Sequence, residues 1–185
     1  MEDKNRIVYL VKQAKNGDSH SFAQLYEMYY KDLYRTALYR LGNVQDAENA
    51  VSDAVVDAYV GIKNLKVEEA FRPWLFKILH NKINKQISEY VKNREHMESD
   101  TVEDMAERLE SRNREVDTAI DKSLIEQAFQ ALNDKDRQVV TCMIYGEMNS
   151  REIAETLHMN QNTVRSIYNR ALDKMKRVLE KGEVL

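Results

Sequence analysis

Residues that interrupt helices are scarce in this sequence. It contains one Pro and five Gly among 185 residues, so few positions force the backbone out of a helical conformation. Stretches in which apolar and polar residues alternate strictly, as they do in half-buried strands, are also absent. The sequence therefore predicts an all-α fold.

Cysteine is just as rare. The single cysteine, Cys142, excludes an internal disulfide framework, and no group of Cys and His residues has the spacing of metal ligands. Cys142 has Val140 and Ile144 as close neighbours in the sequence, which favours a buried apolar position over a nucleophile. We therefore expect neither a metal nor a cofactor.

Long apolar runs are missing as well. None approaches the roughly eighteen residues of a transmembrane helix, and no basic segment followed by an apolar one stands at the start. These absences favour a cytoplasmic protein without membrane insertion. The length of 185 residues is enough for one or two domains, each with its own core.

The net charge of −3 hides an uneven charge distribution. Residues 63–92 contain seven Lys or Arg against three acidic residues, and residues 161–181 contain six against two. Between these basic segments, residues 91–117 contain nine acidic residues against five basic ones. A polyanion responds to local charge, so the two basic segments are candidates for nucleic-acid binding.

The segment Asn149–Lys176 has the pattern of a helix-turn-helix. Asn149 and Glu152 fit a capping box, and Asn160 can cap the second helix. His158 stands in the turn where Gly is common, so we expect it to adopt a positive φ. Apolar residues recur at the spacing that lets two crossed helices bury against each other: Ile153, Ala154, Leu157, Met159, Val164 and Ile167.

The outward face of the second helix in this motif carries amides, hydroxyls and guanidinium groups, with no acid before Asp173. Such groups suit phosphate oxygens and base edges in a DNA major groove. The alternative is an ordinary helical hairpin with a solvated polar face. The candidate DNA-binding residues on this helix are Gln161, Asn162, Thr163, Arg165, Ser166, Asn169 and Arg170.

Four amphipathic helices are predicted within residues 1–90, which we expect to form one domain. Gly17 and Gly42 end the first two, and Asp18 or Ser19 begins the second. Pro73 fits the first turn of the fourth helix, after a loop from Lys63 to Glu69. The predicted helices span residues 6–16, 21–41, 45–61 and about 73–90.

Two of these helices carry opposite charge. The third helix has four acidic residues. The helix dipole explains Asp46 and Glu48, because they lie in the first turn, but it does not explain Asp53 and Asp57. We expect Trp74 of the fourth helix to lie in the core rather than to stack on a base. The fourth helix also has a face of cations and amides without acids. That face consists of Lys77, Asn81, Lys82, Asn84, Lys85 and Gln86.

Residues 91–117 are highly charged and have few large apolar side chains, so they are predicted to be a linker between domains. Residues 118–185 are predicted to form a second, smaller helical domain. Its first helix runs over residues 118–132 and its second over residues 134–145, with Asn133 as N-cap and Gly146 as terminator. The helix-turn-helix completes it, and the linker permits many angles between the domains.

This organisation resembles a bacterial RNA polymerase sigma factor of the extracytoplasmic-function (ECF) group, which keeps only the second and fourth sigma domains. The resemblance covers nearly the whole chain outside the linker. It implies that residues 1–90 are sigma region 2 and that residues 118–185 are sigma region 4. It rests on three motifs: SFAQLYEMYYKDLYRTALYRLGNVQDAENAVSDAVVDAY, FRPWLFKILHN and ALNDKDRQVVTCMIYGEMNSREIAETLHMNQNTVRSIYNRAL.

The resemblance also implies a role for each candidate residue. The helix-turn-helix residues named above would read the promoter −35 element. The −10 element would be bound by Lys77, Asn81, Lys82 and Lys85. Core RNA polymerase, at its β′ clamp helices, would be bound by Asp46, Glu48, Asn49, Ser52 and Asp53.

A sigma factor of this kind is a specificity subunit without catalytic activity of its own, and the resemblance implies core polymerase (β′ clamp helices and β flap) and promoter DNA as partners. It also implies a stress-response anti-sigma factor, often membrane-bound. The chain departs from the family pattern at Asn49, Ser52, Lys85 and Ile167. These departures bear on the promoter sequence that is read more than on the class.

Two other functions remain open. A conventional helix-turn-helix regulator would bind duplex DNA alone as a dimer, but the second basic face, on the fourth helix, is not needed in a sensor domain. A helical hydrolase would use His80 or His96 with nearby acids, yet no Gly-rich phosphate loop or paired-histidine motif supports it. We expect His80 to be partly exposed on its helix, and His20, His96 and His158 to lie in loops or turns.

Overall fold

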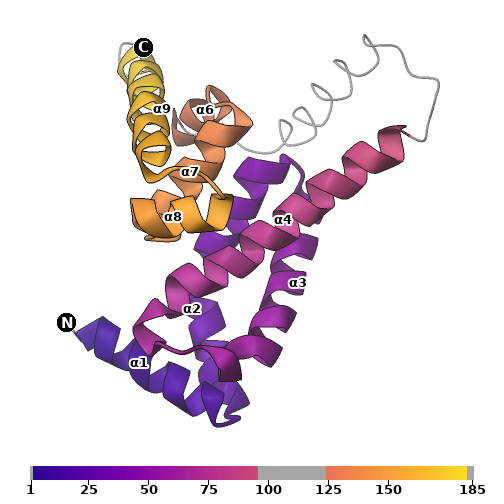
Figure 1. Ribbon diagram of the computed structural model, residues 1–185, viewed down its shortest axis with the longest axis vertical. Helices are drawn as coiled ribbons and strands as arrows, with labels where there is room; N and C mark the ends of the chain where they lie inside the picture. Colours follow the sequence, from indigo (N-terminus) through magenta and orange to yellow (C-terminus); the bar gives the residue numbers. More distant parts are fainter. Residues whose placement is uncertain (1, 96–123, 183–185) are drawn as a thin grey trace.

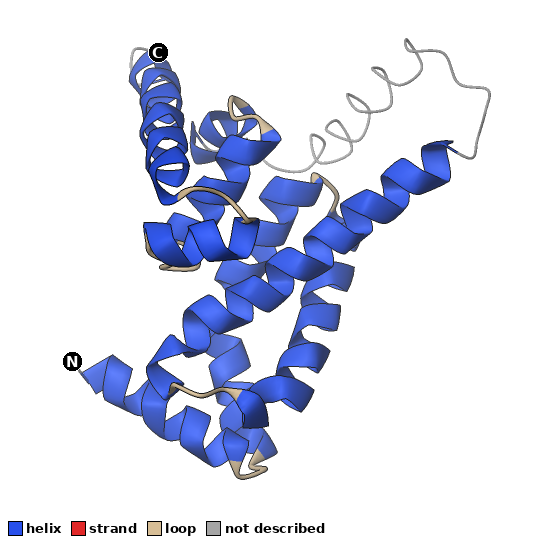
Figure 2. Ribbon diagram, viewed as in Figure 1, coloured by secondary structure: helices blue, strands red, loops and turns tan. Residues whose placement is uncertain are grey.

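The computed structural model describes residues 2–95 and 124–182, and every secondary-structure element among them is helical (Figures 1 and 2). The all-α prediction is confirmed. The N-terminal group comprises α1 (Glu2–Lys15), α2 (Ser19–Leu41), α3 (Val44–Gly61) and α4 (Phe71–Glu95), with 3-10 turns at Ile62–Asn64 and Glu68–Ala70. The C-terminal group comprises α6 (Leu124–Gln130), α7 (Asp134–Ile144), α8 (Ser150–Leu157) and α9 (Gln161–Gly182).

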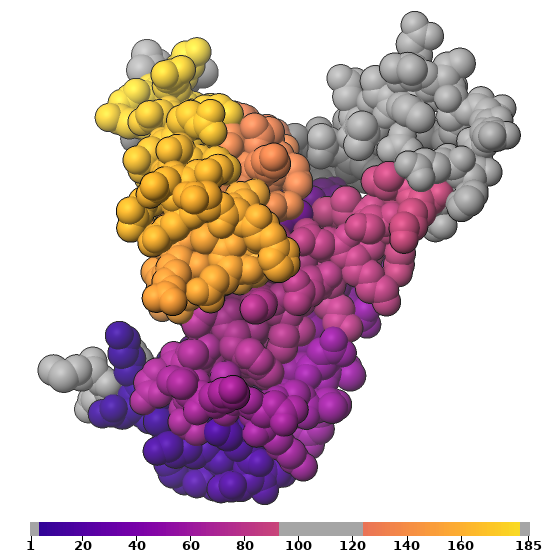
Figure 3. Space-filling model, viewed as in Figure 1, coloured from indigo at the N-terminus to yellow at the C-terminus, as the bar shows by residue number. Residues whose placement is uncertain are grey.

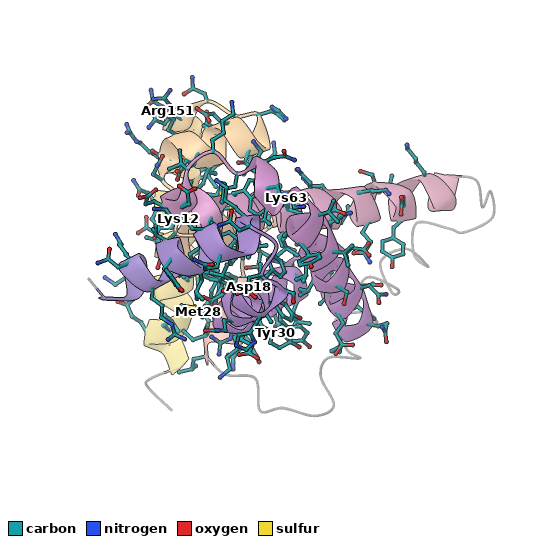
Figure 4. The ribbon with its side chains drawn as sticks, turned by 90° about the horizontal axis from the view of Figure 1, so that it is seen from below. Lys12, Asp18, Met28, Tyr30, Lys63 and Arg151 are labelled. Atoms are coloured by element: carbon teal, nitrogen blue, oxygen red, sulfur yellow. The ribbon has the colours of Figure 1, made fainter. Side chains whose placement is uncertain are left out.

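The helix ends in the N-terminal group follow local sequence signals. The side chain of Asp18 accepts hydrogen bonds from the backbone N–H groups of His20 (3.1 Å) and Ser21 (3.2 Å), so it is the N-cap of α2. Figure 4 shows Asp18 at the junction between α1 and α2. Gly42, with φ of 68°, ends α2 in the left-handed conformation that glycine tolerates best.

The core of the N-terminal group forms where α2, α3 and α4 meet. Leu25, Leu33 and Ala37 of α2 are fully buried, as are Leu79 and Ile83 of α4. The third helix, α3, contributes small side chains at a spacing of three or four residues, which lets its neighbours approach closely. These buried alanines are Ala47, Ala50, Ala54 and Ala58.

Helix α4 is longer than the sequence pattern predicts. It begins at Phe71, so that Pro73 falls within its first turn as expected, and it continues to Glu95 instead of ending near residue 90. No Gly or Pro follows Pro73 in this stretch, so nothing in the backbone stops the helix. The first residues of the predicted 91–117 linker are therefore helical. Its remainder, residues 96–117, and the first six residues of the helix predicted from 118 lie outside the described residues.

The helix-turn-helix has the geometry that the sequence predicts. The Asn149 side chain accepts hydrogen bonds from the N–H groups of Arg151 and Glu152, while the Glu152 carboxylate accepts from the N–H of Asn149 at 2.7 Å, completing the capping box. His158 adopts the left-handed conformation with φ of 53° and ends α8. Ile167 is buried at 5% exposure in the seam between the two helices.

The two groups of helices pack against each other. The C-terminal group (orange to yellow) lies against α2 and α4 of the N-terminal group (indigo to magenta), and α2 contacts both α6 and α7 (Figures 1 and 3). Buried apolar residues of both groups belong to one contiguous cluster, which includes Leu33 of α2 and Val139 of α7. The structure thus shows the two groups in one arrangement, where the sequence left the angle between them open.

Gly146, which follows α7, lies at a close approach within the C-terminal group, and this approach can be tested. A Cβ atom at this position would lie 2.7 Å from the carbonyl oxygen of Cys142 and 3.2 Å from Met148, which leaves no room for a side chain. We expect Gly146→Ala to lower the free energy of unfolding by about 1–3 kcal/mol in urea denaturation. Gly61→Ala is the control, since its Cβ would only touch the Trp74 ring at 3.4 Å. Equal stability of the two variants would contradict the close approach at Gly146.

Candidate nucleic-acid interface

The N-terminal half of α9 presents its polar side chains to solvent. Asn162, Thr163, Arg165, Ser166, Asn169 and Arg170 are exposed, and Gln161 is partly buried. The opposite face of the helix is buried, with Val164 and Ala171 at 0% exposure. The predicted division into an inward apolar face and an outward polar face is therefore confirmed, while the binding of DNA by the outward face stays a prediction at this point.

Short hydrogen bonds hold the start of α9 in place. Asn160 accepts a hydrogen bond from the backbone N–H of Asn162 at 2.8 Å, as expected for its N-cap. The amide of Gln161 donates to the Ser150 hydroxyl at 2.9 Å and so ties the first turn of α9 to the first turn of α8. The beginning of the polar face is thereby anchored to the preceding helix.

One cation beside this face escaped the sequence analysis. Arg151 on α8 is exposed and forms an ion pair with Glu155 at 3.2 Å. Figure 4 shows it at the edge of the molecule, directed away from the body of the protein. The sequence could have identified Arg151, because the inward positions of α8 are apolar and Arg151 stands on the outer, polar side of this helix.

The predicted polar face of α4 is divided in two. Lys77, Asn81 and Lys85 are exposed along its outer strip. Lys82 is partly buried and pairs with Asp57 of α3 at 2.6 Å. On the inner strip, His80 is only 3% exposed, so the expectation of a partly exposed histidine was wrong. The reason is a contact that the helical period does not reveal: α2 brings Arg40 over this side of α4.

Arg40, His80 and Asn84 form a buried polar cluster. The Nδ1 atom of His80 lies 3.4 Å from Nη1 of Arg40, and Nε2 lies 2.9 Å from the side-chain amide of Asn84. Burial, with the positive charge of Arg40 as a second cause, lowers the pKa of His80 to about 3. The imidazole is therefore neutral at physiological pH. A histidine with so low a pKa is too weak a base, and too deeply buried, to be the general base that the hydrolase hypothesis requires. His96 lies outside the described residues.

The acidic patch lies on α3. Glu48, Asn49, Ser52 and Asp53 are exposed, whereas Asp46 is partly buried and accepts a hydrogen bond from the Tyr90 hydroxyl at 2.6 Å. Four of the five residues predicted to bind core polymerase are thus accessible, and the fifth connects α3 to α4.

A polar groove joins this acidic patch to the basic face of α4. It has a volume of about 370 Å³, with the two lysines on the α4 wall, beside Gln86 and Glu89, and Asp53 on the α3 wall. The sequence suggested two independent surfaces, but the pairing of α3 with α4 places them side by side. The groove is lined by Asn49, Ala50, Ser52, Asp53, Lys82, Lys85, Gln86 and Glu89.

Other kinds of site find little support in the described part of the chain. Within residues 2–95 and 124–182, no group of three His, Cys, Asp or Glu side chains is placed to hold a metal ion. None of the helices in these ranges is both long enough and apolar enough to cross a membrane. Cys142 is 2% exposed, and burial raises the pKa of its thiol to about 12, which agrees with the predicted apolar role.

Comparison with known families assigns both groups of helices. The family described as "Sigma-70 region 2" matches residues 25–92, and "Sigma-70, region 4" matches residues 128–177. Together these two matches, in this order, cover more than half of the chain. The chain belongs to the sigma-70 family. With regions 2 and 4 alone matched, it has the domain composition of the ECF group.

A similar protein supports the assignment of this chain to the family. The ECF RNA polymerase sigma factor SigW of Bacillus subtilis is 27% identical to this chain over 176 residues, and the alignment covers 91% of this chain and 94% of SigW.

Two solved structures share the fold of this sigma factor. CnrH, solved in complex with the cytosolic domain of CnrY, matches with a TM-score of 0.61 and 24% identity over 95% of this chain and 98% of CnrH. RpoE of Bartonella quintana, solved in complex with the anti-sigma factor NepR, matches with a TM-score of 0.63 and 18% identity over 86% of this chain and 96% of RpoE.

The buried histidine of the sigma factor predicts a pH dependence of its stability. In the unfolded chain His80 takes up a proton near pH 6.5, whereas the folded state resists protonation down to about pH 3. The unfolded state therefore binds more protons, and the free energy of unfolding falls as the pH drops through this window. His80 alone should lower it by about 2 kcal/mol between pH 7 and pH 5.

Urea denaturation of wild type and His80→Gln at both pH values measures this contribution. The His80→Gln variant should lose about 2 kcal/mol less than wild type on acidification, because it lacks the group that takes up a proton on unfolding. An identical loss in His80→Gln and wild type would show that His80 is not held neutral.

Proposed function

We propose that this sigma factor is the specificity subunit of bacterial RNA polymerase, binding the core enzyme and directing initiation at promoters with defined −35 and −10 elements. The observation that carries the proposal is the separation of two acid-poor basic faces, on α9 and α4, onto two different helix groups. A protein that reads one DNA site needs one such face. A protein that reads two separated elements on one promoter needs both.

The outward face of α9 would enter the major groove at the −35 element. Arg165 and Arg170 can each bond two acceptors on a guanine, while Asn162 and Asn169 can pair with an adenine edge. Gln161, Thr163 and Ser166 would complete the contacts with bases and phosphates. Arg151 on α8 would add a phosphate contact beside this helix.

The outer strip of α4 would bind the −10 element. Lys77 and Lys85 are exposed and suit the phosphates of a single strand as it separates, and the Asn81 amide suits the edge of an unstacked base. Lys82 would have to exchange its ion pair with Asp57 for a phosphate. Both interactions are between partly exposed charges, so this exchange costs little.

The acidic patch of α3 would dock on the β′ clamp helices of the core enzyme. Glu48 and Asp53 would steer the approach of a basic partner, with Asn49 and Ser52 providing hydrogen bonds and Asp46 holding the patch against α4. Region 4 would contact the β flap. The polymerase would supply all catalytic activity, and the sigma factor would supply none.

The same proposal covers organisation and control. Residues 1–90 and 118–185 would be the two functional domains, joined by the acidic linker at 91–117. CnrH and RpoE were solved in complex with CnrY and the anti-sigma factor NepR, which supports control of this chain by an anti-sigma factor as well. The chain would act in the bacterial cytoplasm, where an anti-sigma factor could hold it at the membrane.

Two substitutions test the assignment of the −35 face. We expect Arg165→Ala and Arg170→Ala each to weaken promoter binding by the holoenzyme by about 1–3 kcal/mol, the usual value of a bidentate base contact. Promoter-dependent run-off transcription measures the effect, with Arg6→Ala as a control that removes the same charge from exposed α1. Unchanged transcription with both α9 variants would mean that another face reads the −35 element.

One charge reversal tests the polymerase-binding patch. We expect Asp53→Lys to reduce the affinity for core polymerase at least tenfold without loss of helix content, because it reverses the charge of an exposed acidic residue of the patch. Titration of labelled chain with core enzyme provides the affinity, and circular dichroism the helix content. Glu155→Lys, the same charge change on α8, is the control. Equal affinity of Asp53→Lys and wild type would move the docking surface elsewhere.

A further inference from the structure

The first helix, α1, carries a third basic face, to which neither promoter element is assigned. Residues 4–15 contain four Lys or Arg and no acidic residue. An excess of cations over acids is also what distinguishes the DNA-binding faces proposed for α9 and α4. The match to sigma-70 region 2 begins only at residue 25, so α1 lies outside the segment that the family accounts for.

One strip of α1 is exposed to solvent. The opposite side of the helix is packed into the N-terminal group, where Leu10, Val11 and Ala14 are buried. On the outer side, Tyr9 is 60% exposed, more than any other aromatic side chain in the described part of the chain. The exposed residues at this spacing of three or four positions are hereafter called the α1 strip: Asn5, Tyr9 and Lys12.

Lys15 ties α1 to residues 62–70, the loop that leads into α4. Its Nζ atom donates to the backbone carbonyl of Leu65 and to the carboxylate of Glu68, both at 2.7 Å. Helix α1 also contacts both 3-10 turns of this loop. Because Lys15 compensates Glu68, the charge of Glu68 does not cancel the other cations of this region.

The loop adds two exposed cations beside the α1 strip, Lys63 and Lys66. Figure 4 shows Lys12 and Lys63 in the same part of the molecule, on the opposite side of α1 from Met28 and Tyr30 of α2. The α1 strip and the loop therefore form one surface, which presents an aromatic ring and three exposed cations.

This surface continues the proposed −10 face of α4. The loop ends where α4 begins, at Phe71, and Lys77 follows about 9 Å further along the helix axis. At its other end, Glu95, α4 leads toward region 4, which would read the upstream −35 element. The first turn of α4, with the loop and α1, would therefore lie on the side of the transcription start site.

We propose that the α1 strip, together with Lys63 and Lys66, binds the single-stranded DNA that follows the −10 element toward the start site. This inference rests on the proposed function. Proteins hold single strands by stacking aromatic rings on bases and placing cations against phosphates. Tyr9 would stack on a base, the three lysines would pair with phosphates, and Asn5 would form hydrogen bonds beside the ring.

The chemistry of the α1 strip favours an open strand over other partners. In a duplex the faces of the bases are covered by their neighbours, so Tyr9 can stack on a base only after the strands separate. Stacking tolerates every base, so the site would add affinity for the melted strand without reading its sequence. A membrane surface would need an apolar stripe, and the apolar side of α1 is buried in the core.

Two DNA probes test this site with holoenzyme assembled from the full chain and core RNA polymerase. Both carry a duplex −35 region and a single-stranded −10 element, taken from a promoter that run-off transcription has identified. The short probe ends after the −10 element, and the long probe continues for about ten thymidines, the length that one single-strand site can hold. The ratio of the two affinities measures what the added strand contributes.

We expect Tyr9→Ala to lower the affinity for the long probe about tenfold, the usual order for one stacked base, and to leave the short probe unaffected. Tyr9→Phe retains the ring and should bind both probes as wild type does. Arg6→Ala is the matched control on the same helix, because Arg6 is hydrogen-bonded to Gln24 of α2 and is not part of the α1 strip. An equal ratio of affinities in Tyr9→Ala and wild type would overturn the proposal.

Lys12→Ala tests the phosphate contact. For the long probe, it should reduce the slope of log affinity against log salt by about 0.7, the value for one phosphate of a single strand. For the short probe, the slope should stay the same. An unchanged slope with the long probe would remove Lys12 from the site.

Two further outcomes separate this inference from the proposed function. If Tyr9→Ala weakens both probes equally, α1 contacts the polymerase or the −10 element itself, and the single-strand site is refuted. If pairing the thymidines with a complementary strand leaves the effect of Tyr9→Ala intact, the site does not select single strands. Failure of the wild-type chain to form a holoenzyme that binds the short probe would instead refute the proposed function.

Discussion

The arrangement of this protein depends on one buried charge. The guanidinium of Arg40 is removed from water by α2, α4 and α7, and a buried charge costs several kcal/mol unless hydrogen bonds and an opposite charge compensate it. Asp134 supplies the only carboxylate that it contacts among the described residues, so the position of the C-terminal group is coupled to the satisfaction of Arg40.

This coupling accounts for features on both sides of the interface. Burial keeps His80 neutral, with the positive charge of Arg40 as a second cause, and the inner strip of α4 is thereby removed from the surface that could meet DNA. The outer strip remains accessible and borders the acidic patch of α3 across a shared groove. Opposite charges therefore lie side by side on region 2, and the net charge of −3 does not describe the local charge at the surface of α4 or of α9.

Features that arise from neighbouring residues could be predicted from the sequence. The capping box at Asn149, the positive φ of His158 and the outward face of α9 all follow from residues a few positions apart. The burial of His80 and the pairing of Lys82 could not be predicted, because their partners stand 40 and 25 positions away in the sequence, on other helices. The contact of Arg40 with Asp134 spans 94 positions, and no local pattern encodes it. The helical period thus predicts which residues share one face of a helix, whereas packing against residues distant in the sequence determines which of them stay exposed.

Binding of the wild-type chain to core RNA polymerase tests the central claim most directly. Size-exclusion chromatography of a mixture at moderate salt, without DNA, should show the chain co-eluting with the core enzyme in a one-to-one complex, as a specificity subunit must. Elution of the chain apart from the core enzyme, as a dimer that shifts duplex DNA by itself, would contradict this account. That result would identify a conventional helix-turn-helix regulator built on the sigma-70 fold.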